Sequence, residues 1–423
     1  MDDNRKRPER SVVQSGRHPV SKKSTALTVK ERAIERRREK DREWENAKNI
    51  ERVRHGVDRP LLIIIILLVS LGSVMVFSAS YPNAETFKND GMFYIYRHLI
   101  FVAIGTAAMV FCTFLPYKTY KAFTPILAIV SIALLLLVFV IGAARGVAQR
   151  WIVVGSVTVQ PSEVAKLALA MSLAWYLDRH YDEINGLSEK KKFVHGILVP
   201  GIIMAVFCGL VLIEKHLSGT LILAAIALCI IFLSGASVPK MLLWYGIPVS
   251  ALVGVYLILN PYALDRIKTY TDSDANILDE LWQTTQGLYA IGNGGVLGVG
   301  LGNSNMKHNY VSEAQNDFIF SIWCEEMGFV GGVLLIVLYG LFIWRGMKVA
   351  RRAPDTFTSL TAFGITCQVG IQAALNILVV TDMIFNTGVS LPFFSYGGTA
   401  TIVLMGEMGI LLSISKHSYQ KKI

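Results

Sequence analysis

The chain of 423 residues contains ten apolar runs, each about 17 to 25 residues long, the length that crosses the hydrocarbon core of a bilayer as a helix. Only 17% of the residues are charged and the mean hydropathy is +0.46, whereas soluble proteins carry about 25% charged residues. The sequence therefore predicts an all-α polytopic membrane protein with about ten transmembrane helices. The predicted spans are residues 60–80, 94–114, 122–141, 161–177, 194–213, 219–235, 241–259, 318–344, 357–381 and 396–415.

The net charge of +10 is unevenly distributed along the chain. Residues 1–59 hold 18 Lys and Arg against 11 Asp and Glu, a surplus of +7. Short loops rich in Lys and Arg stay on the cytoplasmic side of the membrane, and with ten spans the basic loops all fall on one side. We expect cytoplasmic tails over 1–59 and 416–423, flanking a membrane domain over 60–415.

The N-terminal tail has few large apolar residues, which predicts a disordered segment or a solvated helix. A basic arm directly before a span suits contact with anionic lipid. Nucleic acid is the alternative ligand for a basic tail, but the membrane explains it better, and we expect no nucleic-acid partner. The tail is too long for a cleavable signal peptide.

The longest loop, residues 260–316, lies between the seventh and eighth spans on the extracytoplasmic side, and loops of this length are usually functional. It is rich in glycine, but no strand precedes the glycines and no Lys-Ser or Lys-Thr pair follows them, so a nucleotide-binding loop is not indicated. Close backbone packing explains them better. Its part 281–301 is predicted to re-enter the membrane, which is tolerated only where protein covers the backbone.

Ionisable residues near the outer ends of the spans mark candidate function, because lipid makes them costly. Glu163 and Lys166 share one face of the fourth span and are spaced to pair; a purely structural ion pair would look the same. Arg150, beside Trp151, is either an interfacial anchor or a functional cation. Asp317 begins the eighth span, where a helix N-terminus favours a carboxylate, so helix cap and catalyst remain alternatives.

No metal motif is present. The chain has no HExxH and no Cys-x-x-Cys, and a lone His216 in the turn 214–220 is more often a hydrogen-bonding group than a ligand. All five cysteines lie in apolar runs and are expected to be core residues.

Taken together, these segments resemble the SEDS family (shape, elongation, division and sporulation proteins). The matching motifs run in family order over about residues 60–415, and the ordered set is highly specific. They are AQRWI (148–152), QPSE (160–163) with Lys166, LSGT (217–220), QGLYAIG (286–292), GLGNS (300–304), DFIF (317–320) with EEMG (325–328), and LPFFSYGG (391–398).

The resemblance implies a ten-helix peptidoglycan glycosyltransferase in the bacterial cytoplasmic membrane. Such an enzyme polymerises lipid II into glycan strands on the outer face and releases polyprenyl diphosphate. The resemblance also implies a class B penicillin-binding protein as partner, which cross-links the product, and further membrane proteins of the division machinery. It makes the aspartate of the DFIF motif, here Asp317, the essential acidic residue.

Two departures from the family pattern stand out. Val311-Ser312-Glu313 and Gln315-Asn316 replace the usual Leu-Pro-Glu and His-Thr. Lys215-His216 stands where Pro-Asp or Pro-His is usual. The aspartate is retained, so activity is expected, with altered substrate contacts near Gln315. The second departure and the long tail favour the division or sporulation branch over elongation.

The reaction joins the 4-hydroxyl of an incoming lipid II sugar to the anomeric carbon of the growing strand. It needs a base for the hydroxyl proton and cations for the departing diphosphate. We assign Asp317 as the base and Arg150, Lys166 and Lys307 as diphosphate contacts, with Glu163 orienting Lys166. Glu313 and Ser395 are further candidates for substrate binding.

A divalent cation such as Mg²⁺ is a candidate cofactor, although no ligand set is recognisable in the sequence. Two other functions remain open from the residues alone. A lipid II flippase would also carry charged groups inside discontinuous helices, and a non-catalytic scaffold of the division machinery would need no base.

Overall fold

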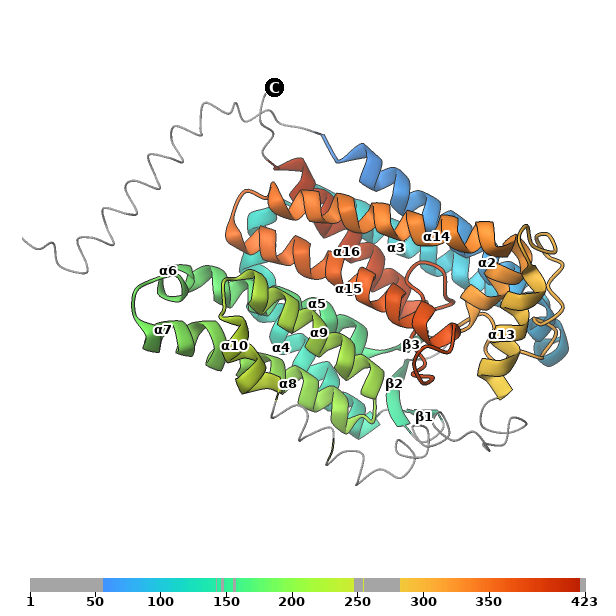
Figure 1. Cartoon of the computed structure of the whole chain (residues 1–423), viewed down its shortest axis with the longest axis horizontal. Helices are drawn as coiled ribbons and strands as arrows, with labels where there is room; N and C mark the ends of the chain where they lie inside the picture. Colours follow the sequence, from blue (N-terminus) through green and yellow to red (C-terminus); the bar gives the residue numbers. More distant parts are fainter. Residues whose placement is uncertain are drawn as a thin grey trace, which may run out of the picture. The chain divides into compact units, whose positions relative to one another are not determined.

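A computed structural model describes residues 56–141, 143–145, 148–154, 157–246, 254 and 282–418. Within these residues the chain forms a bundle of helices with one small sheet (Figure 1). The helices are α2 (Arg59–Lys88), α3 (Phe93–Phe114), α4 (Tyr117–Ile141), α5 (Pro161–Arg179), α6 (Tyr181–Ile184), α7 (Glu189–Phe193), α8 (Val199–Ile213), α9 (Leu217–Leu233), α10 (Val238–Met241), α13 (Trp282–Gly294), α14 (Ile319–Arg351), α15 (Thr356–Val380) and α16 (Gly398–Lys416), with π-helical segments at Val194–Leu198 and Leu242–Gly246 and strands β1 (Ala143–Arg145), β2 (Ala148–Val154) and β3 (Val157–Val159).

Seven described helical segments are long and apolar enough to cross a membrane, namely α2, α3, α4, the continuous segment Glu189–Ile213, α14, α15 and α16. α9 is apolar but only 17 residues long, and α5 carries charged residues at both ends. Both pack among the longer helices, with α5 contacting α4, α9 and α15. The chain is therefore a polytopic helical membrane protein, as predicted.

Three predicted regions lie partly or wholly outside the described residues. They are the N-terminal tail up to residue 55, most of the predicted seventh span (241–259) with the first part of the long loop (260–281), and residues 419–423.

The largest difference between a helix boundary and a predicted span is at the C-terminal end of the first span. α2 continues to Lys88, eight residues beyond the predicted end at Ser80. The extension lies beyond the apolar run that defined the predicted span, and it contains Pro82, which is uncommon inside a helix. The helix ends instead at Asn89, whose left-handed φ of 53° suits a C-cap.

The loop predicted over residues 142–160 contains a three-stranded antiparallel sheet in the order β1-β2-β3. Trp151 pairs with Ala143, and Ile152 pairs with Val159. An all-α prediction missed this sheet because the strands are only three to seven residues long, too short for their periodicity to stand out. The sheet places Arg150 and Trp151 at the end of the bundle where α5 begins.

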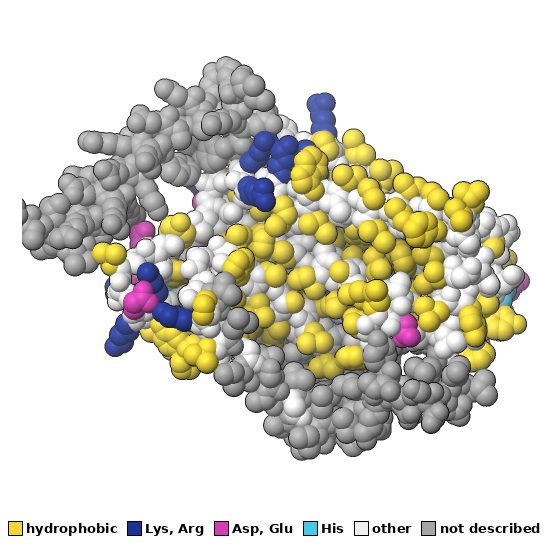
Figure 2. Space-filling view, in the orientation of Figure 1, with side chains coloured by type: hydrophobic (Ala, Val, Ile, Leu, Met, Phe, Trp, Pro, Cys, Tyr) yellow, Lys and Arg dark blue, Asp and Glu magenta, His cyan; other side chains and the backbone are white. Residues whose placement is uncertain are grey.

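The centre of the bundle is formed by α15 and α16. In their most apolar stretches 61% of the residues are buried, compared with 22% in α3 and α4. α3 and α4 therefore turn most of their sides outward, where lipid is the expected solvent. Figure 2 shows hydrophobic side chains covering the flanks of the helices, while Lys and Arg gather in a few patches.

α14 is broken at Gly328, whose φ of 67° and ψ of −171° are not helical. The freed backbone pairs with the turn that follows α13. Val299 N donates to Glu325 O (3.0 Å) and Gly300 N to Glu326 O (3.0 Å), while Phe329 N donates to Gly295 O (2.9 Å). Backbone groups in the last part of the segment predicted to re-enter the membrane are thus paired with the broken helix, and covered backbone of this kind is what a membrane protein tolerates.

Candidate functional site

A pocket of about 210 Å³ lies at the end of the bundle that holds the sheet, where seven segments far apart in sequence converge. It is bounded by β2, the starts of α5, α9 and α16, the segment before α14, one residue of α15, and the loop before α16. The lining residues are Arg150, Trp151, Gln160, Ser162, Glu163, Lys166, His216, Ser218, Gly219, Ile222, Asn316, Asp317, Gln372, Gly388, Val389, Ser390, Tyr396, Gly397 and Ala400.

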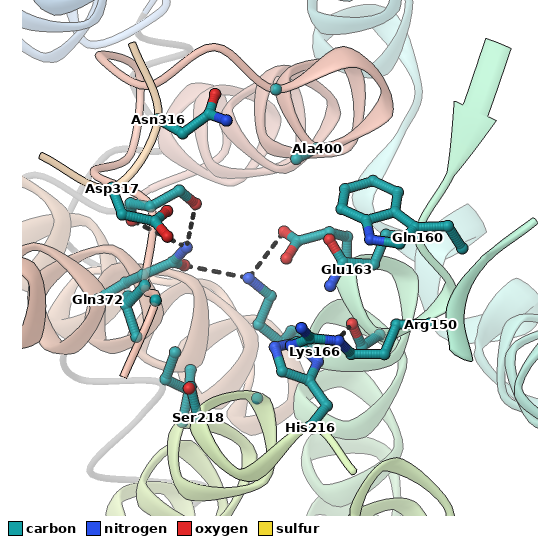
Figure 3. Close-up of a pocket in the computed structure, with 18 of the residues that line it drawn as sticks. Arg150, Gln160, Glu163, Lys166, His216, Ser218, Asn316, Asp317, Gln372 and Ala400 are labelled. Carbon is teal, nitrogen blue, oxygen red and sulfur yellow. Dashed lines mark hydrogen bonds and ion pairs between the residues drawn. The ribbon is translucent and has the colours of Figure 1, made fainter. Parts of the chain in front are cut away.

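The predicted pairing of Glu163 and Lys166 is present. Pro161 opens α5, and one helical turn later Lys166 Nζ lies 2.7 Å from Glu163 Oε2. Nζ also donates to Gln372 Oε1 of α15 at 3.1 Å. Lys166 is only 3% exposed, so its charge is held inside the protein wall and faces the pocket (Figure 3).

Asp317 lies on the opposite side of the pocket from this ion pair (Figure 3). It is not at the helix cap: Phe318 occupies the N-cap position of α14, and the helix starts at Ile319. Its carboxylate lies beside Gly388, where an added Cβ would be 3.3 Å from Asp317 Oδ2. The carboxylate that the sequence placed at a helix start therefore lines the cavity one residue before the cap.

Arg150 reaches the pocket from β2. The strand is tied to α16, because Thr399 Oγ1 donates to Thr158 O at 3.0 Å in the adjoining β3. Arg150 interacts electrostatically with Glu214 and His216, which form the turn between α8 and α9. Three separate elements thus place Arg150 and Lys166 in one cavity with Asp317.

The turn between α8 and α9 contributes two buried titratable groups. Burial lowers the pKa of His216 to about 3, and the positive charges of Arg150 and Lys166 add to the effect. Burial raises the pKa of Glu214 to about 8, against the influence of Arg150. His216 is therefore neutral at pH 7, with Nδ1 3.3 Å from Ser162 Oγ, and the cations of the pocket are Arg150 and Lys166.

Lys307, Glu313 and Ser395, predicted to contact substrate, do not line the pocket. Lys307 is 6% exposed, and its Nζ contacts Glu326 Oε1 (3.0 Å) and Ser78 Oγ (3.0 Å). Glu313 is exposed and accepts a hydrogen bond from Asn316 Nδ2 (2.6 Å). Ser395 donates to Asn316 O at 2.6 Å. Glu313 and Ser395 thus contact Asn316, which lines the pocket, whereas the partners of Lys307 do not line it.

Sequence reasoning missed the polar stripe of α15. Gln368, Gln372 and Asn376 are spaced four residues apart in an otherwise apolar helix and lie on one face. All three are buried, and Gln372 lines the pocket. The four-residue spacing of these polar side chains within an apolar span could have indicated a shared polar face.

The described residues contain no group of three or more His, Cys, Asp or Glu side chains placed to hold a metal ion. The carboxylates that line the pocket are Glu163 and Asp317, and Glu163 is paired with Lys166. These residues alone do not make a divalent-cation site of the usual oxygen-rich kind.

Comparison with known proteins gives one consistent result. Residues 59–420 match the family model of the cell cycle proteins FtsW, RodA and SpoVE. The stage V sporulation protein E of Bacillus subtilis is 36% identical over 363 residues, covering 85% of this chain and 97% of that protein. A probable peptidoglycan glycosyltransferase FtsW of Geobacter sp. (strain M18) is 35% identical over 364 residues, with coverage of 85% and 97%.

Solved structures agree. A chain from a peptidoglycan synthase complex that coordinates polymerization and crosslinking aligns with a TM-score of 0.69 and 26% identity, covering 86% of this chain and 99% of that one. The rod shape determining protein RodA of Thermus thermophilus aligns with a TM-score of 0.62 and 26% identity, with coverage of 86% and 98%. The chain belongs to the FtsW/RodA/SpoVE family of cell cycle proteins, the SEDS family that its motifs indicated.

Proposed function

We propose that this protein is a peptidoglycan glycosyltransferase that polymerises lipid II on the outer face of the cytoplasmic membrane. Family membership and the names of its relatives support this class of activity. The observation that carries the proposal is the pocket, which brings the Asp317 carboxylate into one cavity with the cations Arg150 and Lys166.

In the proposed reaction Asp317 accepts the proton of the 4-hydroxyl of the incoming lipid II sugar. The hydroxyl oxygen forms a bond to the anomeric carbon of the growing strand, and the bond from that carbon to the diphosphate oxygen breaks. Arg150 and Lys166 stabilise the negative charge that develops on the departing polyprenyl diphosphate. Glu163 and Gln372 hold Lys166 in place for this role.

The proposed topology has ten spans, both termini in the cytoplasm and the pocket outside. The segment 241–259 supplies the span that the described helices lack. The tail 1–59 lies in the cytoplasm, and the loop 260–316 lies outside. This arrangement gives lipid II direct access to Asp317 from the outer leaflet.

The proposed partner is a class B penicillin-binding protein acting in cell division or sporulation, with other membrane proteins of that machinery. The similarity to a chain of a peptidoglycan synthase complex that couples polymerization with crosslinking supports such a partner. Similar levels of identity to a sporulation protein and to FtsW proteins support either process.

The test is polymerisation of labelled lipid II by the purified full-length chain together with its transpeptidase partner. Asp317→Asn is expected to lose activity by about 10² to 10⁴-fold, the usual contribution of a general base, while keeping its melting temperature. The matched control is Glu85→Gln, which also replaces a carboxylate by an amide but does so at an exposed position of α2. This variant should polymerise lipid II normally.

Near-normal polymer from Asp317→Asn would remove this residue from the base role. Transfer of labelled lipid II across liposomes by the wild-type chain, with no polymer formed, would instead support the flippase. If neither polymer nor transfer is seen and Asp317→Asn still supports cell division, the protein would be a non-catalytic scaffold of the division machinery.

A further inference from the structure

Three consecutive backbone carbonyls in the segment that carries Asp317 are each held by a hydrogen-bond donor from the α15–α16 region. Tyr396 N donates to Gln315 O at 2.9 Å. Ser395 Oγ donates to Asn316 O at 2.6 Å. Asn376 Nδ2 donates to Asp317 O at 2.7 Å. Each donor belongs to a different residue, and the acceptors follow one another without a gap.

Asn376 also holds the loop that lies beside the Asp317 carboxylate. The same Nδ2 donates to Val389 O at 2.7 Å, and Val389 follows Gly388, the residue that faces the Asp317 carboxylate. One fully buried amide therefore holds both the backbone that carries Asp317 and the loop that faces it. A single side chain therefore joins these two segments directly.

The same loop is bound at its next two residues. Gln372 Nε2 lies 3.4 Å from Ser390 O, and Leu391 N donates to Ser395 Oγ at 2.7 Å. Gln372 is also the partner of Lys166. Gln372 and Asn376 thus connect the cationic wall of the pocket to the wall that carries Asp317.

A buried amide in an apolar helix is costly unless it is hydrogen-bonded, and here its donor hydrogens go to the two segments that border Asp317. We propose that Asn376 is a positioning residue for the glycosyl transfer, holding the Asp317 carboxylate at the place where the acceptor hydroxyl must lose its proton. Ser395 assists it through the hydrogen bond from its hydroxyl to the backbone carbonyl of Asn316. We call Asn376 and Ser395 together the clamp. This proposal rests on the function proposed above for Asp317.

Misplacing a reacting group by about 1 Å costs roughly 10²-fold in rate. The cations proposed to bind diphosphate lie on β2 and α5, so a shift of Asp317 should leave substrate binding nearly unchanged. Asn376→Leu, which keeps the size of the side chain but removes its donors, is therefore expected to lower kcat about 10- to 100-fold. The KM for lipid II should change little. Initial rates of polymerisation are measured against lipid II concentration with the full-length chain and its partner.

The matched control is Gln368→Leu, the same kind of change two turns earlier on the same face of α15. Gln368 Nε2 donates to both carboxylate oxygens of Glu407, at 3.0 and 2.9 Å, and neither residue lines the pocket. This variant is expected to melt at a lower temperature while keeping the kcat of its folded fraction. A general loosening of α15 would lower kcat in both variants and would overturn the proposal.

Ser395→Ala is the second variant, because it removes one hydroxyl and leaves α15 intact. It should also lower kcat with KM unchanged. A raised KM with unchanged kcat would show that Ser395 binds substrate and is no part of the clamp. Asp317→Asn in the same assay separates the two hypotheses: if it is active, the function proposed for Asp317 fails; if it is inactive while Asn376→Leu has normal kcat, only the positioning role fails.

Discussion

Three carboxylates at or behind the pocket have three different environments, although the sequence presents each only as an acidic residue near a span. Glu163 is paired with Lys166. Glu214 is 2% exposed, and neither of its oxygens has a hydrogen-bond partner among the described residues. Asp317 is half-buried on a segment whose carbonyls are clamped. The structure thus distinguishes them: Glu163 is held by a cation, Glu214 is buried behind the pocket wall, and Asp317 lines the pocket.

Glu214 gives a pH-dependent prediction, because it lies in the turn between α8 and α9, outside the spans. Burial raises its pKa from 4.5 to about 8. Between these values the folded protein keeps a proton that the unfolded chain has lost, so the free energy of unfolding falls as pH rises. Glu214→Gln should lack this fall, and its melting temperature should exceed that of the wild type by a margin that grows up to about pH 8.

The measurement is thermal unfolding of both proteins in detergent micelles across this pH range, with Glu85→Gln as the exposed control. Arg150 is the charged group that acts on Glu214. Parallel curves for Glu214→Gln and the wild type would mean that Glu214 is ionised and paired with Arg150 throughout.

At the scale of elements, the broken helix α14 and the turn after α13 form one backbone-paired unit. Gly298 has a φ of +82°, and an added Cβ would lie 2.2 Å from Glu326 O. Gly328 has a φ of +67°, and its Cβ would lie 2.3 Å from Gly298 N. Here the glycines serve close approach of two backbones, as the sequence suggested. They fix the first turns of α14, which follow directly on Asp317.

Gly298→Ala should therefore destabilise the protein by about 2–5 kcal/mol, since it adds a left-handed residue and a backbone overlap. Polymerisation should fall with it, because the start of α14 shifts. The control is Gly292→Ala in α13, where no other atom lies within 4 Å of the added Cβ and alanine favours the helix. Equal melting temperatures for the two variants would contradict the tight backbone pairing.

At the scale of the whole bundle, ion pairs join helices at the end away from the pocket. Arg345 of α14 binds both oxygens of Asp58 at 2.7 and 2.6 Å, just before α2 begins. Asp58 N in turn donates to Ser415 Oγ of α16 at 3.1 Å. Lys121 of α4 pairs with Asp178 of α5. Ion pairs therefore join helices at one end of the bundle, and the polar pocket lies at the other. In the proposed topology the first end is cytoplasmic and the second is extracytoplasmic.

The proposed topology predicts opposite accessibility for two exposed positions. A cysteine at Glu85, near the outer end of α2, should react with a membrane-impermeant maleimide in intact cells. A cysteine at Lys190, in α7, should react only after the membrane is permeabilised. The five native cysteines lie in helices and are unpaired, and an impermeant reagent should not reach them there. Labelling of Lys190→Cys in intact cells would reverse the orientation.

A structural feature could be predicted from the sequence where it depends on residues that are close together in the chain. Long apolar runs predicted most of the helices, and the i,i+3 spacing predicted the pair of Glu163 and Lys166, because both depend on residues near one another in the chain. The small sheet escaped because its strands are short. The contact of Lys307 with Ser78 was not predictable, since the two residues are 229 positions apart.

The sequence by itself determined a helical membrane protein of the FtsW/RodA/SpoVE family with Asp317 as its leading acidic residue. Hydropathy, charge and motif order are properties of the linear chain, and they required no fold. Only the tertiary structure decided which polar residues share the pocket, because α5, α15 and the segments before α14 and α16 meet through packing between distant parts of the chain. That packing placed Arg150 and Lys166 with Asp317, left Lys307 and Ser395 outside the lining of the pocket, and revealed Asn376.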